Sequence, residues 1–235
     1  MMALAVTALV LSLLMPVAYA PNPCADVHIV GVRGSGQSGY GEQVGDVVDA
    51  TVNAISAQGR SVTTDSLPYP AISITDSFGL VLLNGDYERS VLSGVGALGD
   101  SLEAITASCP MSDIVLVGYS QGAQVIKLAL SSSRPDHRIA SVVLLADPTR
   151  DPSQRGILRL GDPSVEREGS FGPVALPDHI RTVAIDVCAP GDGVCERGRS
   201  DLAAHIDGYR DAAGAVIPWL LADLAQRIAG PSPLR

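Results

Sequence analysis

A serine between two glycines carries the strongest chemical signal in this sequence. Gly118-Tyr119-Ser120-Gln121-Gly122 follows Asp113 and the apolar run 114–117, and it precedes a helix-like run, 123–130. The G-x-S-x-G spacing is typical of a nucleophile on a sharp strand-to-helix turn, because glycine neighbours leave room for the strained backbone and the serine oxygen projects into a cleft. The alternative is a serine that caps an ordinary helix. We predict that Ser120 is a nucleophile.

A serine hydroxyl attacks poorly until a base removes its proton, and that base needs a carboxylate to orient it. In enzymes that hold the serine on such a turn, the acid and then the histidine follow it along the chain. His28 precedes Ser120, and His137 lies in the polar turn 131–138 with no loop-borne acid between it and the serine. The remaining candidates for the base are His179 and His205.

The choice between these histidines depends on the acid. Asp192 lies in Cys188-Ala-Pro-Gly-Asp-Gly-Val-Cys195, a loop that a disulfide would close just beyond a predicted strand. A turn clamped in this way holds a carboxylate where it can orient an imidazole. If Asp192 is the acid, only His205 follows it. We therefore predict a catalytic set of Ser120, Asp192 and His205.

Other interpretations of these residues stay open. Asp192 has the setting of an ordinary Gly-Asp-Gly turn residue, and His205 that of a solvated helix histidine. Asp147, at the end of a predicted strand, could instead pair with His179. Asp186 is expected inside a strand.

The oxyanion of an acyl-transfer reaction needs two hydrogen-bond donors. The backbone N–H of Gln121 follows the nucleophile at a helix N-terminus, where such groups are unpaired. The second donor is expected from Arg33-Gly34-Ser35-Gly36, through the N–H of Ser35 and its hydroxyl. A flexible turn or a phosphate cradle is the alternative, but residues 34–39 lack the dinucleotide-loop spacing and a Walker lysine.

The elements that must position these residues alternate between strands and helices. Short, β-branched and almost charge-free segments predict buried parallel strands at 27–31, 114–118, 142–146 and 182–187. Apolar residues three and four apart predict helices at 41–58, 87–108, 121–132 and 212–228. Alternation of this kind indicates a doubly wound α/β sheet, whose sites lie at the carboxyl ends of the strands.

Some parts of the chain resist this pattern. Segments 61–83 and 150–178 are rich in loop-forming residues and receive no element, and loops of that length are usually functional. Trp219 is expected in the core of the C-terminal helix. No linker separates two composition regimes, so we predict one domain over residues 21–235.

The composition excludes several classes of protein. With 46% hydrophobic residues the chain can bury a core, and 16 Lys and Arg against 25 Asp and Glu give a net charge of -9. A net negative charge repels phosphate groups and anionic lipids, so it argues against a protein that binds nucleic acid or an anionic membrane surface.

The first 20 residues predict a secretory signal peptide. They contain an apolar run, Pro16 and the pattern Ala18-Tyr19-Ala20, which is typical of a cleavage site. An uncleaved anchor is the alternative, but the run is shorter than the roughly 20 residues that span a membrane.

Four cysteines in an exported chain predict disulfides. They permit three pairings. Cys188 and Cys195 are close enough to close one small loop, which leaves Cys24 with Cys109. Metal binding is the alternative, and no histidine has ligand spacing beside a cysteine.

In these motifs the sequence resembles the cutinase family of secreted serine esterases. The resemblance rests on the G-Y-S-Q-G motif, on Arg33-Gly34-Ser35, on the Cys-x3-Asp-x2-Cys loop with a histidine beyond it, and on Cys24 with Cys109. It implies a three-layer α/β-hydrolase sandwich with a mainly parallel sheet and no lid domain. It also implies Ser120 as nucleophile, His205 as base, Asp192 as acid, and Ser35 with Gln121 as the oxyanion hole. The stretch 72–89 departs from the family and enlarges either an acyl-binding wall or the core.

We therefore predict a secreted carboxylic-ester hydrolase, extracellular or bound to the cell wall, that forms an acyl-enzyme on short to medium-chain esters, lipids or polyesters. No metal or cofactor is expected, and neither is nucleic acid or stable membrane insertion; a monomer is expected. A phospholipase, a thioesterase or an acetylxylan esterase on the same scaffold is the alternative. The second alternative is a secreted module that binds a partner and catalyses no reaction.

Overall fold

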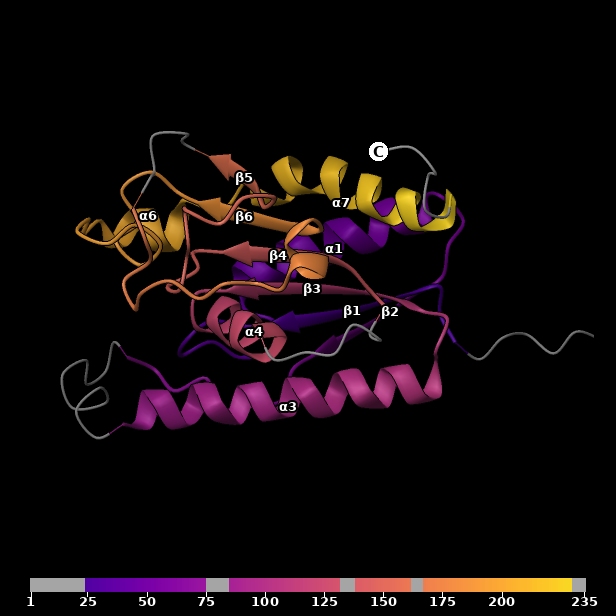
Figure 1. The fold of residues 1–235 in the computed structure, drawn as a ribbon, viewed down its shortest axis with the longest axis horizontal. Coiled ribbons are helices and arrows are strands. Elements are labelled where there is room, and N and C mark those ends of the chain that lie inside the picture. The colour runs from indigo at the N-terminus through magenta and orange to yellow at the C-terminus, as the bar shows by residue number, and fades with distance from the viewer. Residues whose placement is uncertain (1–23, 75–84, 132–137, 162–166, 230–235) are drawn as a thin grey trace, which may run out of the picture.

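A six-stranded parallel sheet forms the centre of the molecule (Figure 1). The computed structural model describes residues 24–74, 85–131, 138–161 and 167–229. The strands lie in the order β2-β1-β3-β4-β6-β5. Their bounds are β1 Val27–Val32, β2 Val62–Ser66, β3 Asp113–Tyr119, β4 Ile139–Leu145, β5 Leu158–Gly161 and β6 Ala184–Cys188. Every residue of β3 and β4 is buried, as expected for parallel strands covered on both faces.

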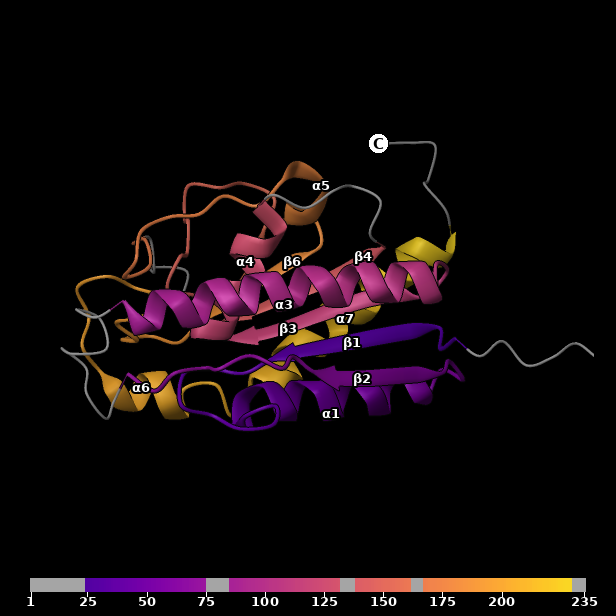
Figure 2. The ribbon, with the colours of Figure 1, turned by 90° about the horizontal axis from the view of Figure 1, so that it is seen from below.

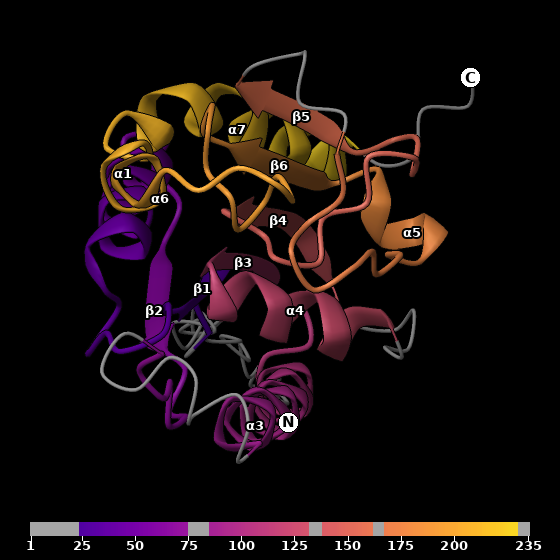
Figure 3. The same cartoon turned by 90° about the vertical axis from the view of Figure 1, so that its left-hand side faces the viewer.

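Helices cover both faces of the sheet (Figure 2). One face packs against α3 and α4, and the other against α1 and α7. The helices are α1 Glu42–Ser56, α3 Asp86–Ser108, α4 Gln121–Ser131, α5 Asp178–Arg181, α6 Leu202–Asp207 and α7 Ala212–Ala229. The short helix α6 lies beyond the carboxyl ends of the strands, where the sequence analysis expects the site (Figures 1 and 3). The predicted three-layer α/β sandwich is confirmed.

The four predicted strands and four predicted helices all form, with small differences at their ends. Two strands that the sequence analysis left unassigned are β2, within 61–83, and β5, within 150–178. Both are edge strands with half-exposed residues, so neither has the continuous apolar run of a buried strand. Two short helices, α5 and α6, were also missed.

The expectation for Trp219 was wrong. Its side chain is 49% exposed, whereas Val216, Leu220 and Leu224 of the same helix are buried. Those three residues repeat every four positions and form one stripe, and Trp219 lies about 100° around the helix from Leu220.

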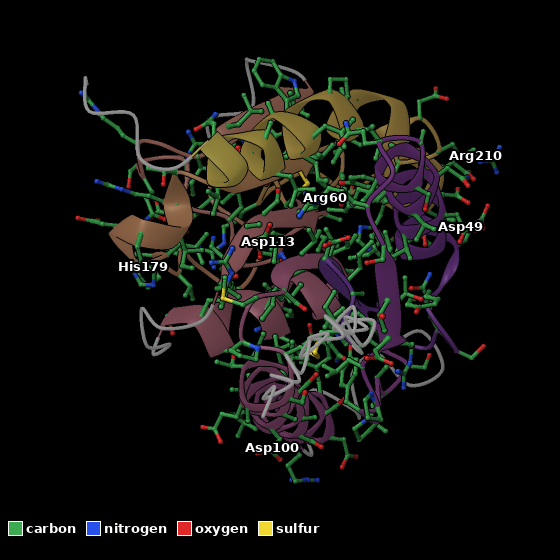
Figure 4. The ribbon with its side chains drawn as sticks, turned by 90° about the vertical axis from the view of Figure 1, so that its right-hand side faces the viewer. Asp49, Arg60, Asp100, Asp113, His179 and Arg210 are labelled. Atoms are coloured by element: carbon green, nitrogen blue, oxygen red, sulfur yellow. A yellow bond between two sulfur atoms is a disulfide. The ribbon has the colours of Figure 1, made fainter. Side chains whose placement is uncertain are left out.

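The amino ends of the strands carry a charged cluster at the opposite end of the molecule from α6 (Figure 4). The carboxylate of Asp113 accepts hydrogen bonds from Arg60 at 2.9 Å and from Arg138 at 2.7 Å. Both oxygens of this buried carboxylate are therefore committed to ion pairs that join the ends of β3 and β4 to the chain after α1.

The predicted signal peptide, residues 1–20, lies outside the described residues, as do His137 and residues 75–84 of the departing stretch. Among the helices that the structure describes, none has both the length and the apolar character that crossing a membrane requires.

Candidate active site

Ser120 occupies a strained turn between β3 and α4. Its backbone has φ 52°, a left-handed conformation that is uncommon outside glycine. The glycines on either side make this turn possible. A Cβ on Gly122 would lie 2.0 Å from the carbonyl oxygen of Val32, and one on Gly118 would lie 2.6 Å from Ile126. The backbone of the turn therefore packs directly against the end of β1, as the predicted nucleophile turn requires.

Asp192 and His205 lie in hydrogen-bond contact. Nδ1 of His205 is 3.0 Å from Oδ2 and 3.1 Å from Oδ1 of the carboxylate. Asp192 is fully buried, and two further donors satisfy it: the backbone N–H of Val194 at 2.8 Å and the hydroxyl of Tyr209 at 2.6 Å. Because each oxygen is bonded, the carboxylate holds one orientation toward the imidazole.

Tyr119 brings His205 beside the serine turn. The two rings stack with centroids 5.1 Å apart, and the Tyr119 hydroxyl donates to the backbone carbonyl of His205 at 2.7 Å. Tyr119 directly precedes Ser120 in the chain. The structure thus collects the predicted Ser120, Asp192 and His205 at one end of the sheet.

The two tyrosines around His205 remain hydrogen-bond donors across the ordinary pH range. Burial raises the pKa of the Tyr209 phenol well above its usual value, and the charge of Asp192 raises it further. The same two causes, burial first, raise the pKa of Tyr119. Neither phenol therefore ionises near neutral pH.

The candidate oxyanion donors lie on two elements. Gln121 is the first residue of α4, so no earlier turn of the helix can accept its backbone N–H. The hydroxyl of Ser35, however, donates to the carbonyl of Ile72 at 2.6 Å and accepts from the N–H of Ile74 at 3.1 Å. This hydroxyl is therefore bonded to the loop that follows β2, and the oxyanion role predicted for the N–H and hydroxyl of Ser35 stays a prediction.

The rival acid is engaged elsewhere. The buried carboxylate of Asp147 accepts from Nζ of Lys127 at 2.8 Å and from the hydroxyl of Thr149 at 2.7 Å. His179 lies on the short helix α5, at the edge of the molecule in Figure 4. Asp186, inside β6, pairs with Arg150 at 2.7 Å, and burial raises the pKa of its carboxyl against the opposing charge of that arginine. The buried side chains among these, Asp147 with Lys127 and Asp186 with Arg150, occupy the interior near the end of β4, whereas His179 is exposed.

Both predicted disulfides are present. Cys188 and Cys195 close the loop that carries Asp192, and Cys24 joins Cys109 across 85 residues. The backbone N–H of Ser170 donates to the carbonyl of Val194 at 2.9 Å, and that of Phe171 to the carbonyl of Pro148. The unassigned segment 150–178 thus ties the Asp192 loop to the end of β4.

Exposed apolar side chains surround this end of the sheet. Leu202 and Ile206 flank His205 on α6, and Ile72 belongs to the segment that Ser35 contacts; their exposed fractions are 61%, 49% and 36%. A cavity of about 180 Å³ lies beside the acid and base, lined by Asp192, Val194, Leu202 and His205 among others. Arg199, Ser200 and Asp201 also line this cavity, whereas the exposed side chains of Leu202, Ile206 and Ile72 offer apolar surface that suits an acyl or alkyl chain.

A parallel sheet with helices on both faces and a strained serine turn after a central strand is the architecture of the α/β hydrolases. Comparison with known families is more specific. The chain matches the Cutinase family over residues 23–224, and it belongs to that family. The predicted relationship to cutinase-type serine esterases is therefore confirmed.

Named relatives agree with this assignment. The chain is 32% identical over 190 residues to carboxylesterase Culp1 of Mycobacterium tuberculosis, covering 79% of this chain and 75% of the relative. It is 30% identical over 205 residues to a cutinase of Hypocrea jecorina, covering 84% and 68%. The solved structure of an acetylxylan esterase has the same fold, with a TM-score of 0.70 at 22% identity over 86% of this chain and 99% of that one.

Sequence reasoning missed the groups that hold the acid and base. Tyr119 is inside the serine motif, but its spacing gives no sign that the side chain reaches His205. Tyr209 follows His205 by one helical turn, which would have been a weak signal. Gln37 and Gln43, whose contacts are described below, carry no motif.

Proposed function

We propose that this chain is a serine carboxylic-ester hydrolase that works through an acyl-enzyme. Ser120 attacks the ester carbonyl while Nε2 of His205 takes the hydroxyl proton, and the resulting oxyanion accepts hydrogen bonds from the N–H groups of Gln121 and Ser35. The C–O bond to the alcohol then breaks, and the imidazolium gives its proton to the leaving oxygen. Water, deprotonated by His205, attacks the acyl-enzyme; the C–O bond to Ser120 then breaks, the imidazolium returns its proton to Oγ of Ser120, and the acid leaves.

One observation carries this proposal most directly. The strained Ser120 turn is next to Tyr119, whose ring stacks on the imidazole that Asp192 holds at 3.0 Å. A buried carboxylate that orients the Nδ1–H of a histidine leaves Nε2 as the acceptor for the serine proton.

Covalent labelling tests the nucleophile. An activated alkyl phosphonate mimics the tetrahedral intermediate, and we expect one phosphonate to bind per folded chain. Ser120→Ala should take up none, and Ser56→Ala, which changes an exposed serine at the end of α1, should label like the wild type. A folded wild type that resists the phosphonate, or a Ser120→Ala variant that still reacts, would exclude this nucleophile.

The substrate class follows from the apolar rim. Leu202, Ile206 and Ile72 support short to medium acyl esters, lipids or polyester surfaces, as the names cutinase and carboxylesterase of the relatives do. Rates across p-nitrophenyl esters of increasing acyl length, with acetylxylan, a thioester and phospholipid alongside, separate these substrates. We expect Ile206→Ser to lower the rate on longer acyl chains more than on acetate. Equal losses on both would remove Ile206 from the acyl site.

The setting of the enzyme is part of the proposal. The chain is secreted as one domain, residues 21–235, after residues 1–20 are removed, and it acts as a monomer that needs no cofactor. The disulfides support an oxidising compartment. Amino-terminal sequencing of the exported protein tests the cleavage, and light scattering of purified protein tests the monomer.

A secreted module without catalysis is the competing function. It predicts a folded protein that is inert toward every ester above and toward the phosphonate, whereas the proposed enzyme reacts with both.

A further inference from the structure

The helix that carries His205 packs only lightly on the rest of the protein, chiefly through the His205 ring, which stacks on Tyr119. None of the residues of α6 is fully buried, and the helix has only 6 residues. The carboxylate of its N-cap residue Asp201 accepts a hydrogen bond from the N–H of Ala204, and the backbone N–H of Asp201 donates to the carbonyl of Gly191 at 3.3 Å. A helix this short gains little from its own backbone hydrogen bonds. The position of His205 therefore depends on its ring contact with Tyr119 and on polar contacts with other parts of the chain.

Two neighbouring carbonyl groups of α6 receive such contacts. Tyr119, at the end of β3, donates to the carbonyl of His205 at 2.7 Å. Gln43, on α1, donates through Nε2 to the carbonyl of Ile206 at 2.9 Å. Gln43 and Ile206 are 163 residues apart in the sequence, so this hydrogen bond joins the amino-terminal part of the chain to the carboxyl-terminal part. Two attachment points on successive residues restrict both the position and the rotation of the helix.

Gln43 is itself held by a second amide. Its Oε1 accepts from Nε2 of Gln37 at 2.7 Å, and Oε1 of Gln37 accepts from the backbone N–H of Gly34 at 2.8 Å. Gly34 directly precedes Ser35, the candidate oxyanion donor. A continuous path of hydrogen bonds therefore runs from the oxyanion loop through Gln37 and Gln43 to the helix that carries His205.

The direction of every bond in this path is determined by its two ends. The N–H of Gly34 can only donate, so Gln37 must present its oxygen there and its amide nitrogen to Gln43. Gln43 then presents its nitrogen to Ile206, whose carbonyl can only accept. Reversing either amide would place two donors or two acceptors face to face. The path is thus satisfied in one arrangement only.

Local packing also leaves room for this path. A Cβ on Gly41 would lie 2.2 Å from Oε1 of Gln37, and one on Gly34 would lie 3.1 Å from the same oxygen. Gln43 is 7% exposed, so water competes poorly for its amide. A buried amide that lost its partner would leave unsatisfied polar groups, which resists its displacement.

We propose that Gln37 and Gln43 form a positioning bridge that fixes the His205 helix relative to the oxyanion loop. The inference rests on the proposed function, because the role of the bridge is to hold the base His205 at the working distance from the oxyanion donor of Ser35. Proton transfer from the serine and charge development on the substrate oxygen occur in the same step. Misplacement of either group by a fraction of an ångström slows that step.

Gln43→Met tests the bridge with little change in volume. Methionine keeps the length of the side chain but removes both amide groups. We expect kcat per phosphonate-titrated site to fall about tenfold, the effect of about one lost hydrogen bond in the transition state, with KM within about twofold of wild type. Gln58→Met, the same substitution at an exposed residue beyond the end of α1, should change neither value. Titration of active sites removes any contribution from misfolded protein.

The double variant tests the path itself. Gln37→Met should lower kcat in the same direction, and adding it to Gln43→Met should cost little more, because either substitution alone breaks the path. The low-field proton signal of Nδ1–H in His205 should broaden in both single variants and stay sharp in Gln58→Met.

Several results would overturn the bridge. They are an unchanged kcat per site in Gln43→Met, losses that multiply in the double variant, or a sharp His205 signal in both single variants. If Gln43→Met fails to fold, an unchanged kcat in Gln37→Met, whose residue is half-buried in a loop, refutes the bridge equally well. A wild type that is inert toward esters and phosphonate instead refutes the proposed function.

Discussion

The nucleophile and the base of the proposed active site are held by different forces. Ser120 lies on a turn whose glycines touch backbone, with Gly122 packed against the end of β1 and most of α4 buried. His205 lies on α6, which fully buries none of its residues. This helix accepts hydrogen bonds from Tyr119 and Gln43 and donates to Asp192 and Gly191, and the His205 ring stacks on Tyr119.

This difference predicts different responses to mutation. A closely packed turn cannot shift by a small amount, because its backbone already touches its neighbours. A mutation there either leaves the turn in place or disrupts the packing. A helix attached by hydrogen bonds can shift by small amounts when one bond is lost, and each bond contributes only about 1 kcal/mol. Changes on the serine side should therefore act on folding, and changes on the histidine side should act on the rate.

The largest effect is expected at Gly122. Gly122→Ala places a methyl group 2.0 Å from the carbonyl oxygen of Val32, and we expect the free energy of unfolding to fall by about 5 kcal/mol or more. Gly96→Ala is the matched control, since a Cβ there meets nothing within 4 Å; a helical alanine should raise stability by up to about 1 kcal/mol. Urea unfolding measures both. A Gly122→Ala protein of normal stability would show that packing does not hold the turn.

The two disulfides should separate stability from activity. Cys24→Ser with Cys109→Ser opens the closure of 85 residues and should cost about 4 to 5 kcal/mol of unfolding free energy, with kcat per titrated site unchanged. Cys188→Ser with Cys195→Ser should cost about 2 to 3 kcal/mol but lower kcat, because this loop carries Asp192. Unfolding curves and active-site titration distinguish them. Loss of kcat in the first pair alone would contradict the comparison.

Two buried tyrosines provide a matched test of the hydrogen bonds. Tyr209→Phe removes the 2.6 Å bond to Asp192, and we expect kcat to fall about tenfold. Tyr87→Phe removes a 2.8 Å bond to Gln124 on α4 and should leave kcat within about twofold. Initial rates on titrated enzyme compare the two. If the two variants lost the same factor in kcat, the serine side and the histidine side of the site would depend equally on hydrogen bonds.

The smallest effect concerns alkaline stability. Burial raises the pKa of Tyr119 and Tyr209 in the folded protein, whereas in the unfolded chain these phenols titrate near a pKa of about 10. Their contribution is therefore complete below that pH and is lost as the pH rises, because the unfolded state ionises first. Near pH 10.5 each phenol should remove less than about 1 kcal/mol. Unfolding measured against pH should be flatter in Tyr209→Phe, and an unchanged slope would place its phenol in water.

The sequence predicts the four central strands of the sheet but not its two edge strands, β2 and β5. A central strand such as β3 is apolar throughout, so its composition alone identifies it. The edge strands β2 and β5 mix polar and half-exposed residues, and they exist because a neighbouring strand supplies hydrogen bonds. The prediction for Trp219 was wrong for a related reason. A large aromatic side chain is often buried, but only the residues on the side of α7 that faces the sheet are covered, and Trp219 lies outside that stripe.

The sequence by itself determined the local chemistry. The glycines around Ser120, the cysteines around Asp192 and the order of the three candidate catalytic residues follow from steric rules and short loops, which act between near neighbours in the chain. Only the tertiary structure decided how the base is held. Tyr119 donates to the His205 carbonyl from β3, Gln43 donates to the Ile206 carbonyl from α1, and Tyr209 donates to Asp192 from the turn after α6. Hydrogen bonds between residues distant in sequence depend on where the fold brings each donor and acceptor.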